Sequence, residues 1–308
     1  MVAFLGGGFL TTSSSGSSLP SDVTSDGVDF VITPNSSPTV PATGKIQFGA
    51  TDVGGRILPS FIGELGAVAP LQPSWARKSV GMLIPNGGGS ATMGVVGIQN
   101  GVATGTATGR TPASTNLFTG TRRLGYVSAA GAGSAAGVRT SVTPFWLGNA
   151  AGAGGFHVVM RFGISDAVIV AGRQFCGLQA SSGAPTDVNP STFANMIGIG
   201  SDSGDTVMQL YASGAAAQAR TSLGANFPVN TTNVDLYELA LYAAPNASQV
   251  TYRVERINTG HTATGTISAG ASLPANTTFL AAQMWRANGG VASAVGIDIL
   301  QAYFESDY

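Results

Sequence analysis

The stretch QVTYRVERI, residues 249–257, indicates the fold class of this chain. Its apolar residues at positions 250, 252 and 254 alternate with polar residues at positions 251, 253 and 255. This period of two is typical of a β-strand with one face on a core and the other in water. The stretch therefore predicts a β-strand with one exposed face, not a helix.

Similar short runs, separated by turn residues, fill the chain from residue 141 onward. VGIDILQAYF alternates less cleanly, because Ile297, Ile299 and Gln301 oppose Asp298 and Leu300. Helical periodicity is nearly absent, so the pattern predicts an antiparallel β-sandwich of jelly-roll type. The other expected strands are SVTPFWL (141–147), GFHVVMRFGI (155–164), GRQFCGLQ (172–179), NMIGIGS (195–201), TVMQLYA (206–212), VDLYELALYA (234–243), TATGTIS (262–268) and TTFLAAQMW (277–285).

The composition is unusual in its lack of charge. Charged residues make up 9% of the 308 residues, against roughly 25% in an average soluble domain. The chain is 44% hydrophobic with a net charge of −1, which favours a folded protein over a disordered one. Its 44 glycines have a high entropic cost on folding, so we expect tight turns and burial against neighbouring subunits to offset it.

Four segments follow from the composition along the chain. Residues 1–43 are rich in Ser, Thr, Pro and Gly and are expected to form an extended amino-terminal arm, with VDFVI (28–32) as a possible strand. Residues 44–85 predict a small β-module whose two strands flank a turn at residues 52–55. Residues 86–140 have few large side chains and are expected to connect this module to the sandwich at residues 141–308.

Several classes of protein are disfavoured. The scattered Lys and Arg residues form no stripe for nucleic acid, and no apolar run is long enough for membrane insertion. The start MVAFLGGGFL has no basic residue before its apolar stretch and does not fit a secretory signal. The single cysteine, Cys176, excludes an intrachain disulfide and is expected to be a small buried side chain.

The search for catalytic groups gives no candidate. His157 lies inside a strand run, where a sheet-facing histidine is expected, and His261 is interpreted as a turn residue. No G-x-S-x-G or HExxH motif occurs, so no catalytic residue, metal site or cofactor is predicted. A pair of distant carboxylates, as in glycosidases, is not excluded by spacing.

Four residues are candidates for receptor or glycan binding. Asp202 and Asp205 lie in GSDSGDT, where close acids on a loop suit Ca²⁺, although a hairpin turn is the favoured interpretation. Trp285 and Arg286 lie where a strand is expected to end before a turn. A flat ring beside a hydrogen-bonding group suits a sugar, but core packing is the favoured interpretation of Trp285.

Two parts of the chain resemble phage proteins. GKIQFGATDVGGRILPSFIGELGAVAPLQPSWARKSVGMLIP (44–85) resembles the amino-terminal module of tailed-phage fibre proteins, in which a strand pair precedes a G-x-x-x-x-LQP segment. The runs GFHVVMRFGI, NMIGIGSD, VTYRVERINTGHTATGTI and IDILQAYFESDY are similar to a concanavalin-like, jelly-roll carboxy-terminal sandwich of phage virion and tail-fibre proteins. The resemblance implies a homotrimer whose amino-terminal part is fixed to the virion and whose sandwich faces outward.

We therefore expect a non-enzymatic phage virion protein, a tail fibre or receptor-binding protein that attaches the particle to a host surface glycan or protein. It would assemble in the host cytoplasm and contact neighbouring virion proteins through its amino-terminal region. Two alternatives stay open: a capsid decoration or head-spike protein, and a glycan-cleaving tailspike enzyme.

Overall fold

The computed structural model describes residues 23–25, 30–32, 34, 40–42, 45–62, 68–70, 78–85, 93–96, 101–217 and 219–307. The chain divides into two compact units, residues 1–73 and residues 74–308. Most of the expected arm at residues 1–43 lies outside the described residues. The roles assigned above to the four segments stay predictions.

The first unit contains a three-stranded antiparallel sheet in the order β3-β4-β5 and a separate pair, β1 with β2. β3 and β4 are the two strands expected on either side of the turn at residues 52–55. Gly54 and Gly55 both have positive φ, and the Gly55 amide donates to Asp52 Oδ1 over 2.7 Å. This geometry is a tight hairpin turn that glycine favours. The strands are β1 (Val23–Ser25), β2 (Phe30–Ile32), β3 (Gln47–Val53), β4 (Arg56–Ile62) and β5 (Val68–Pro70).

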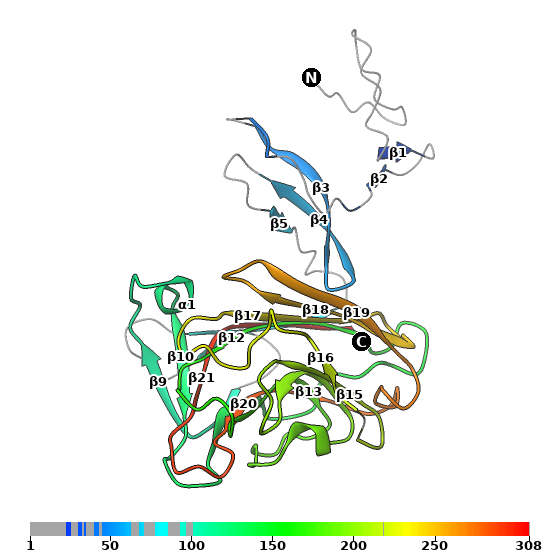
Figure 1. Cartoon of the computed structure of the whole chain (residues 1–308). Coiled ribbons are helices and arrows are strands. Elements are labelled where there is room, and N and C mark those ends of the chain that lie inside the picture. Colours follow the sequence, from blue (N-terminus) through cyan, green and yellow to red (C-terminus); the bar gives the residue numbers. More distant parts are fainter. Residues whose placement is uncertain are drawn as a thin grey trace. The chain divides into compact units, whose positions relative to one another are not determined.

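The second unit is an antiparallel β-sandwich, as the alternating runs predicted. One sheet runs β19-β18-β17-β12-β21-β10-β9, and β6, which also pairs with β7, pairs with β21. The facing sheet runs β16-β15-β14-β13-β20-β11-β8. Successive segments cross repeatedly between the two sheets, which is the jelly-roll pattern. In Figure 1 the layer with β17, β18 and β19 lies above the layer with β13, β15 and β20.

The strands of the first sheet are β6 (Lys78–Pro85), β7 (Met93–Val96), β9 (Thr106–Arg110), β10 (Arg123–Val127), β12 (Phe156–Ile164), β17 (Tyr237–Ala243), β18 (Gln249–Arg256), β19 (His261–Ser268) and β21 (Gly296–Asp307). Those of the second are β8 (Gly101–Thr104), β11 (Ala135–Thr140), β13 (Arg173–Gln179), β14 (Met196–Ser201), β15 (Gln209–Ser213), β16 (Thr221–Ser222) and β20 (Ala281–Ala287). The described helices are α1 (Leu117–Gly120) and the 3₁₀ turn η1 (Pro190–Thr192).

The main core lies between the two sheets. Val250 and Val254, the apolar positions of the opening stretch, are both fully buried there. Burying such side chains stabilises the fold by about 1.5–3 kcal/mol each. β21 alternates less cleanly because both of its faces are covered: Ile297 and Ile299 enter the core, whereas Leu300 packs with Phe118 of α1. The opposite face also buries Asp298, which pairs with Arg110 and Arg123.

Two segments differ from expectation. SVTPFWL forms only a single bridge, between Phe145 and Leu280, and no described strand covers it. Pro144, which lacks a backbone N–H, lies in the middle of this run and disfavours a continuous ladder. Conversely, β8 to β11, from the expected connecting region, pair within both sheets of the sandwich. The sandwich therefore includes strands that begin before residue 141.

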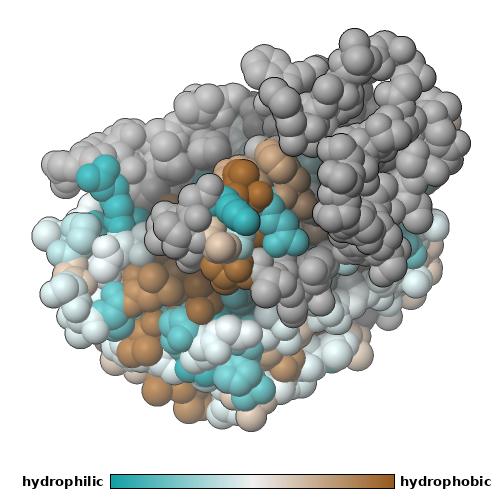
Figure 2. Space-filling view, turned by 90° about the horizontal axis from the view of Figure 1, so that it is seen from above, coloured by the Kyte–Doolittle hydropathy of each residue, from teal (hydrophilic) through white to brown (hydrophobic). Residues whose placement is uncertain are grey.

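The described surface mixes residues of different hydropathy. In the view of Figure 2 much of it is pale, with hydrophilic and hydrophobic residues scattered among the pale ones. In the described part of the chain, no helix is both long and apolar enough to span a bilayer.

Candidate functional site

Three of the four residues singled out in the sequence are buried at one end of the sandwich. Trp285 is 1% exposed and packs in a second hydrophobic cluster, on the outer face of the second sheet, with Phe175 and Tyr211. The ring of Phe193 lies edge-on to the indole, with centroids 6.4 Å apart. This is the core packing favoured for Trp285, and a role for its ring in binding stays a prediction.

Arg286, the next residue of β20, lies on the inner face and is fully buried. Its Nε and Nη2 atoms bond both carboxylate oxygens of Asp166, at 2.5 and 2.9 Å. Nη2 also donates to the carbonyl of Val168, and Nη1 donates to Gln174 Oε1 over 3.1 Å. The charge of this buried guanidinium is paired and four of its five N–H donors have acceptors, which is the condition for keeping a charge inside a protein.

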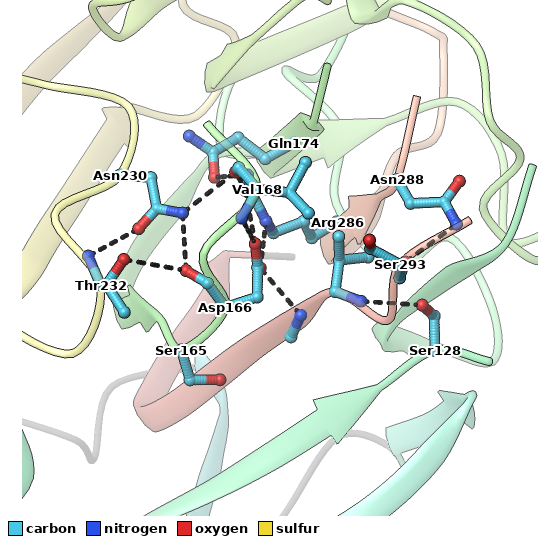
Figure 3. Close-up of polar contacts among 12 residues, drawn as sticks. Ser128, Ser165, Asp166, Val168, Gln174, Asn230, Thr232, Arg286, Asn288 and Ser293 are labelled. Carbon is cyan, nitrogen blue, oxygen red and sulfur yellow. Dashed lines mark hydrogen bonds and ion pairs between the residues drawn. The ribbon is translucent and has the colours of Figure 1, made fainter. Parts of the chain in front are cut away.

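A ring of neutral groups completes this arrangement (Figure 3). Asn230 donates from its side-chain amide to the carbonyls of Asp166 and Val168, at 2.8 and 3.1 Å. The backbone N–H of Thr232 donates to Asn230 Oδ1 over 2.7 Å, and that of Gly296 donates to Asp166 Oδ2 over 2.9 Å. The loop at residues 165–169 is therefore held to β20, β21 and the segment before β17. The cluster fixes loops, and it uses four of the five N–H donors of Arg286.

Asp202 and Asp205 lie in the connection from β14 to β15. The Asp205 N–H donates to the Asp202 carbonyl over 3.2 Å, and the Asp202 N–H donates to Asp205 Oδ2 over 2.8 Å. This is the turn geometry favoured from the sequence. The Arg220 guanidinium bonds both carboxylates, so an internal cation occupies the place suggested for Ca²⁺. Desolvation by burial raises the pKa of Asp205.

The described residues contain no group of three or more His, Cys, Asp or Glu side chains that would hold a metal. His157 is buried in β12, edge-on to the rings of Tyr242 and Tyr303. His261 is exposed and begins β19 directly after a turn, with Nδ1 2.8 Å from Thr259 Oγ1. Cys176 is fully buried, as expected, and burial raises the pKa of its thiol well above the usual value. A neutral buried thiol is a poor nucleophile.

The opposite end of the sandwich carries a hollow. Its volume is about 300 Å³. It is lined by the segment that follows β17 and by the segment that precedes β20. This volume is at the lower end of the range of about 300–1,000 Å³ typical of small-molecule sites. The hollow is lined by Leu147, residues 246–248, Ala269, Gly270 and residues 273–276.

Backbone hydrogen bonds hold the walls of the hollow. The Asn246 N–H donates to the carbonyls of Leu147 and Ala153, at 3.0 and 2.9 Å, and Asn246 has a φ of 56°. The Gly148 N–H donates to the Asn276 carbonyl over 3.0 Å. Among the described residues, the side-chain amides of Asn246 and Asn276 make no hydrogen bond, and both residues are exposed. These amides are available to a ligand.

Two aromatic residues lie close in sequence to residues that line this hollow. Trp146 precedes Leu147, and Phe279 follows Asn276 by three residues. Their rings are stacked, with centroids 5.1 Å apart and an interplanar angle of 21°. Phe279 is 50% exposed. The end of the sandwich therefore combines a hollow, unused amides and an exposed aromatic surface.

The fold is a jelly-roll β-sandwich, the class to which lectin domains also belong. No family model and no curated protein matches the chain. Among solved structures, the chain is similar to peanut lectin with a bound 9mer peptide, at 9% identity over 75% of this chain and 98% of that one, with a TM-score of 0.46. It is similar to arcelin-5, a lectin-like defense protein from Phaseolus vulgaris, at 8% identity over 76% of this chain and 100% of the other, with a TM-score of 0.47.

A third similar structure comes from a phage. It is the CBM2 module of the evolved Dit of Lactobacillus casei BL23 phage J-1, at 14% identity over 60% of this chain and 77% of the module, with a TM-score of 0.40.

Sequence reasoning missed the hollow and its aromatic pair. Trp146 lies in a run that was expected to be a strand, and Phe279 lies in another, more than a hundred residues away. Neither residue belongs to a motif. The available signal is the absence of charged residues from the segments around both, residues 144–155 and 268–280.

Proposed function

We propose that the chain is a non-enzymatic structural protein of a phage virion, a tail fibre or receptor-binding protein that attaches the particle to the host cell surface. The observation that carries this proposal is the hollow, which is lined by no charged residue and has two unused amides in its lining. The stacked Trp146 and Phe279 lie close in sequence to its lining residues. Such a place suits binding. The carboxylates of Asp166, Asp202 and Asp298, by contrast, are bonded to arginines and are not placed for acid–base chemistry.

The first unit supports a role in assembly. On one face of the β3–β4 hairpin, Phe48 and Ile57 are 65 and 51% exposed, and Ile46, directly before β3, is 54% exposed. Exposed apolar groups that gather on one face mark protein interaction sites. We propose that this face contacts other copies of the chain, in a homotrimer, or neighbouring virion proteins. Several copies would make weak single binding sites sufficient, because linked sites act with a high effective concentration.

The test uses the purified full chain and bacteria that are infected by a phage carrying it. We expect the protein to bind these cells and to reduce adsorption of the phage, whereas resistant cells that lack the receptor bind none. A native oligomer that neither binds nor blocks would overturn the proposal. Antibody labelling of intact particles separates the tail location from a capsid decoration or head spike, since labelling around the head would favour the latter.

A further inference from the structure

We propose that the hollow at the Trp146 end of the sandwich binds an uncharged saccharide of the cell surface. This inference rests on the proposed attachment function and adds to it the chemical class of the ligand. Its basis is three features of this end of the sandwich: a hollow lined by no ionisable side chain, two unused amides in that lining and an exposed aromatic ring close to it in sequence.

The first feature is a complete lack of charge. The residues that line the hollow come from segments 144–155, 244–249 and 268–280, and none of these segments contains Lys, Arg, His, Asp or Glu. A carboxylate or phosphate on the ligand would lose its water there without gaining an opposite charge, which is unfavourable. An ammonium group would be equally disfavoured. A neutral, hydroxyl-bearing ligand incurs no such cost.

The second feature is the pair of amides. Each Asn side chain has an NH₂ donor and a carbonyl acceptor, and a sugar hydroxyl can both donate and accept. The two Asn backbones are fixed by the bonds from Asn246 N–H to two carbonyls and from Gly148 N–H to the Asn276 carbonyl. Both amides are therefore anchored on a rigid frame, which reduces the entropy lost when a ligand binds.

The third feature is the exposed face of Phe279. Its ring is supported from behind by the indole of Trp146, in a stacked arrangement with centroids 5.1 Å apart. The C–H face of a pyranose ring is apolar and flat, so it can cover an exposed ring while its hydroxyls stay hydrogen-bonded. We expect a saccharide of more than one ring to use this aromatic face in addition to the amides of the hollow.

The experiment uses the full chain and an array that carries neutral bacterial oligosaccharides, built from hexoses and N-acetylhexosamines, together with their uronic-acid and phosphorylated counterparts. We expect retention of neutral glycans and exclusion of the acidic ones. Titration of a retained glycan should change the fluorescence of the protein. Trp146→Phe, which keeps a ring against Phe279, should bind the glycan with a much smaller fluorescence change.

The variants address the site directly. Phe279→Ala and Asn276→Ala should each weaken binding of the neutral glycan by about tenfold or more. Asn246→Gly should do the same while keeping the left-handed backbone, which glycine tolerates. The matched control is Leu117→Ala at the other end of the sandwich, because Leu117 is 48% exposed against 50% for Phe279. This control should bind as the parent does.

Three outcomes would overturn the inference: no neutral glycan is retained, acidic glycans are retained preferentially, or the variants at the hollow bind as tightly as the control. A peptide ligand would appear as cell binding that is removed by protease treatment of the cells and not by Phe279→Ala. In that case the inference fails while the attachment function stands. If instead neutral glycans bind but phage adsorption is unaffected, the inference stands and the attachment function fails.

Discussion

Arg286 and Asp166 lie 120 residues apart in the chain and form a two-pronged ion pair inside the sandwich. The arginine side chain is fully buried and that of the aspartate is 7% exposed. The pair joins the last residues of β20 to the loop that follows β12. One contact thus ties the second sheet to the first at the end opposite the hollow.

Replacing this arginine should strongly destabilise the fold. Arg286→Met leaves the Asp166 carboxylate buried without its partner, and breaking a buried pair in this way costs about 3–5 kcal/mol. Urea unfolding monitored by circular dichroism measures the effect. The control is Arg161→Met, because Arg161 is 44% exposed in its pair with Glu238 and such pairs contribute only about 0–1 kcal/mol. Equal losses in the two variants would contradict this assignment.

Two glycines of one loop beside the hollow should differ in their tolerance of a side chain. A Cβ on Gly148 would lie 1.7 Å from the Ala153 carbonyl oxygen, whereas a Cβ on Gly152 would meet nothing within 4 Å. Both have positive φ, so Gly152→Ala should cost only about 1–2 kcal/mol of conformational strain. Gly148→Ala should cost distinctly more and displace the bond from Gly148 N–H to Asn276. Their urea midpoints are compared, and similar midpoints would show that this close approach is not rigid.

Calcium should not stabilise the protein at the Asp202–Asp205 turn. Every carboxylate oxygen of the two residues already accepts a hydrogen bond. Asp202 Oδ1 accepts from the Ser191 N–H and Tyr211 hydroxyl, Asp205 Oδ2 accepts from the Asp202 N–H, and Arg220 binds the other two oxygens. The Tm measured in millimolar CaCl₂ should equal that in EDTA. A Tm that rises with calcium in the parent, and not in Asp205→Asn, would show that the ion displaces Arg220.

The strands were largely predictable because their signal is local. The run GFHVVMRFGI became β12 and QVTYRVERI became β18, since alternation along a strand directly reflects which face meets the core. The exception was SVTPFWL, where Pro144 breaks the ladder. Residues 86–140 contain few large side chains and were not expected to form a core of their own. Their strands instead pair with strands of the two sheets and share the core between those sheets.

The candidate site was less predictable because its contacts join distant segments. Arg286 was singled out, but its partner lies 120 residues away and no spacing rule connects them. The adjacent position, Trp285, faces the other side of the sheet, as period-two alternation requires, and packs among rings from three other segments. Asn246 and Asn276 likewise line one hollow only because the fold brings their segments together. Sequence can therefore predict which residues lie in strands, whereas the grouping of loop residues depends on topology.

Stability should fall in alkaline solution because three tyrosines are buried. Burial raises the pKa of Tyr126, Tyr211 and Tyr237, and nearby carboxylates raise those of Tyr211 and Tyr237 further. The unfolded chain releases these protons near pH 10, whereas the folded protein holds them to higher pH. Their stabilising contribution is therefore complete below about pH 10 and is lost as the pH rises above it. Absorbance titration should show these tyrosines ionising together with loss of circular dichroism. Ionisation of all tyrosines near pH 10 in a protein that stays folded would contradict this.

The apolar face of the first unit should control self-association. The register of β3 with β4 pairs Asp52 with Ile57 and Phe48 with Phe61, which places Phe48 and Ile57 on one face of the hairpin, and Ile46 directly precedes β3. The residues of β4 on the other face alternate with them and are buried. Phe48→Ser and Ile57→Ser together should therefore shift the native mass toward the monomer by removing exposed apolar area. Sedimentation equilibrium of the full chain measures this shift.

The matched control is Thr51→Ser, which lies on the opposite face of the same strand and changes little apolar area. It should leave the mass distribution unchanged. A parent that is monomeric at all concentrations, or a Phe48→Ser/Ile57→Ser variant with an unchanged oligomer, would show that this face is not used between copies. The thermal unfolding of the sandwich should be the same in parent and variants, because these substitutions lie in the other unit. The comparison thus separates association from folding, and it tests whether the exposed face of the hairpin holds copies of this chain together.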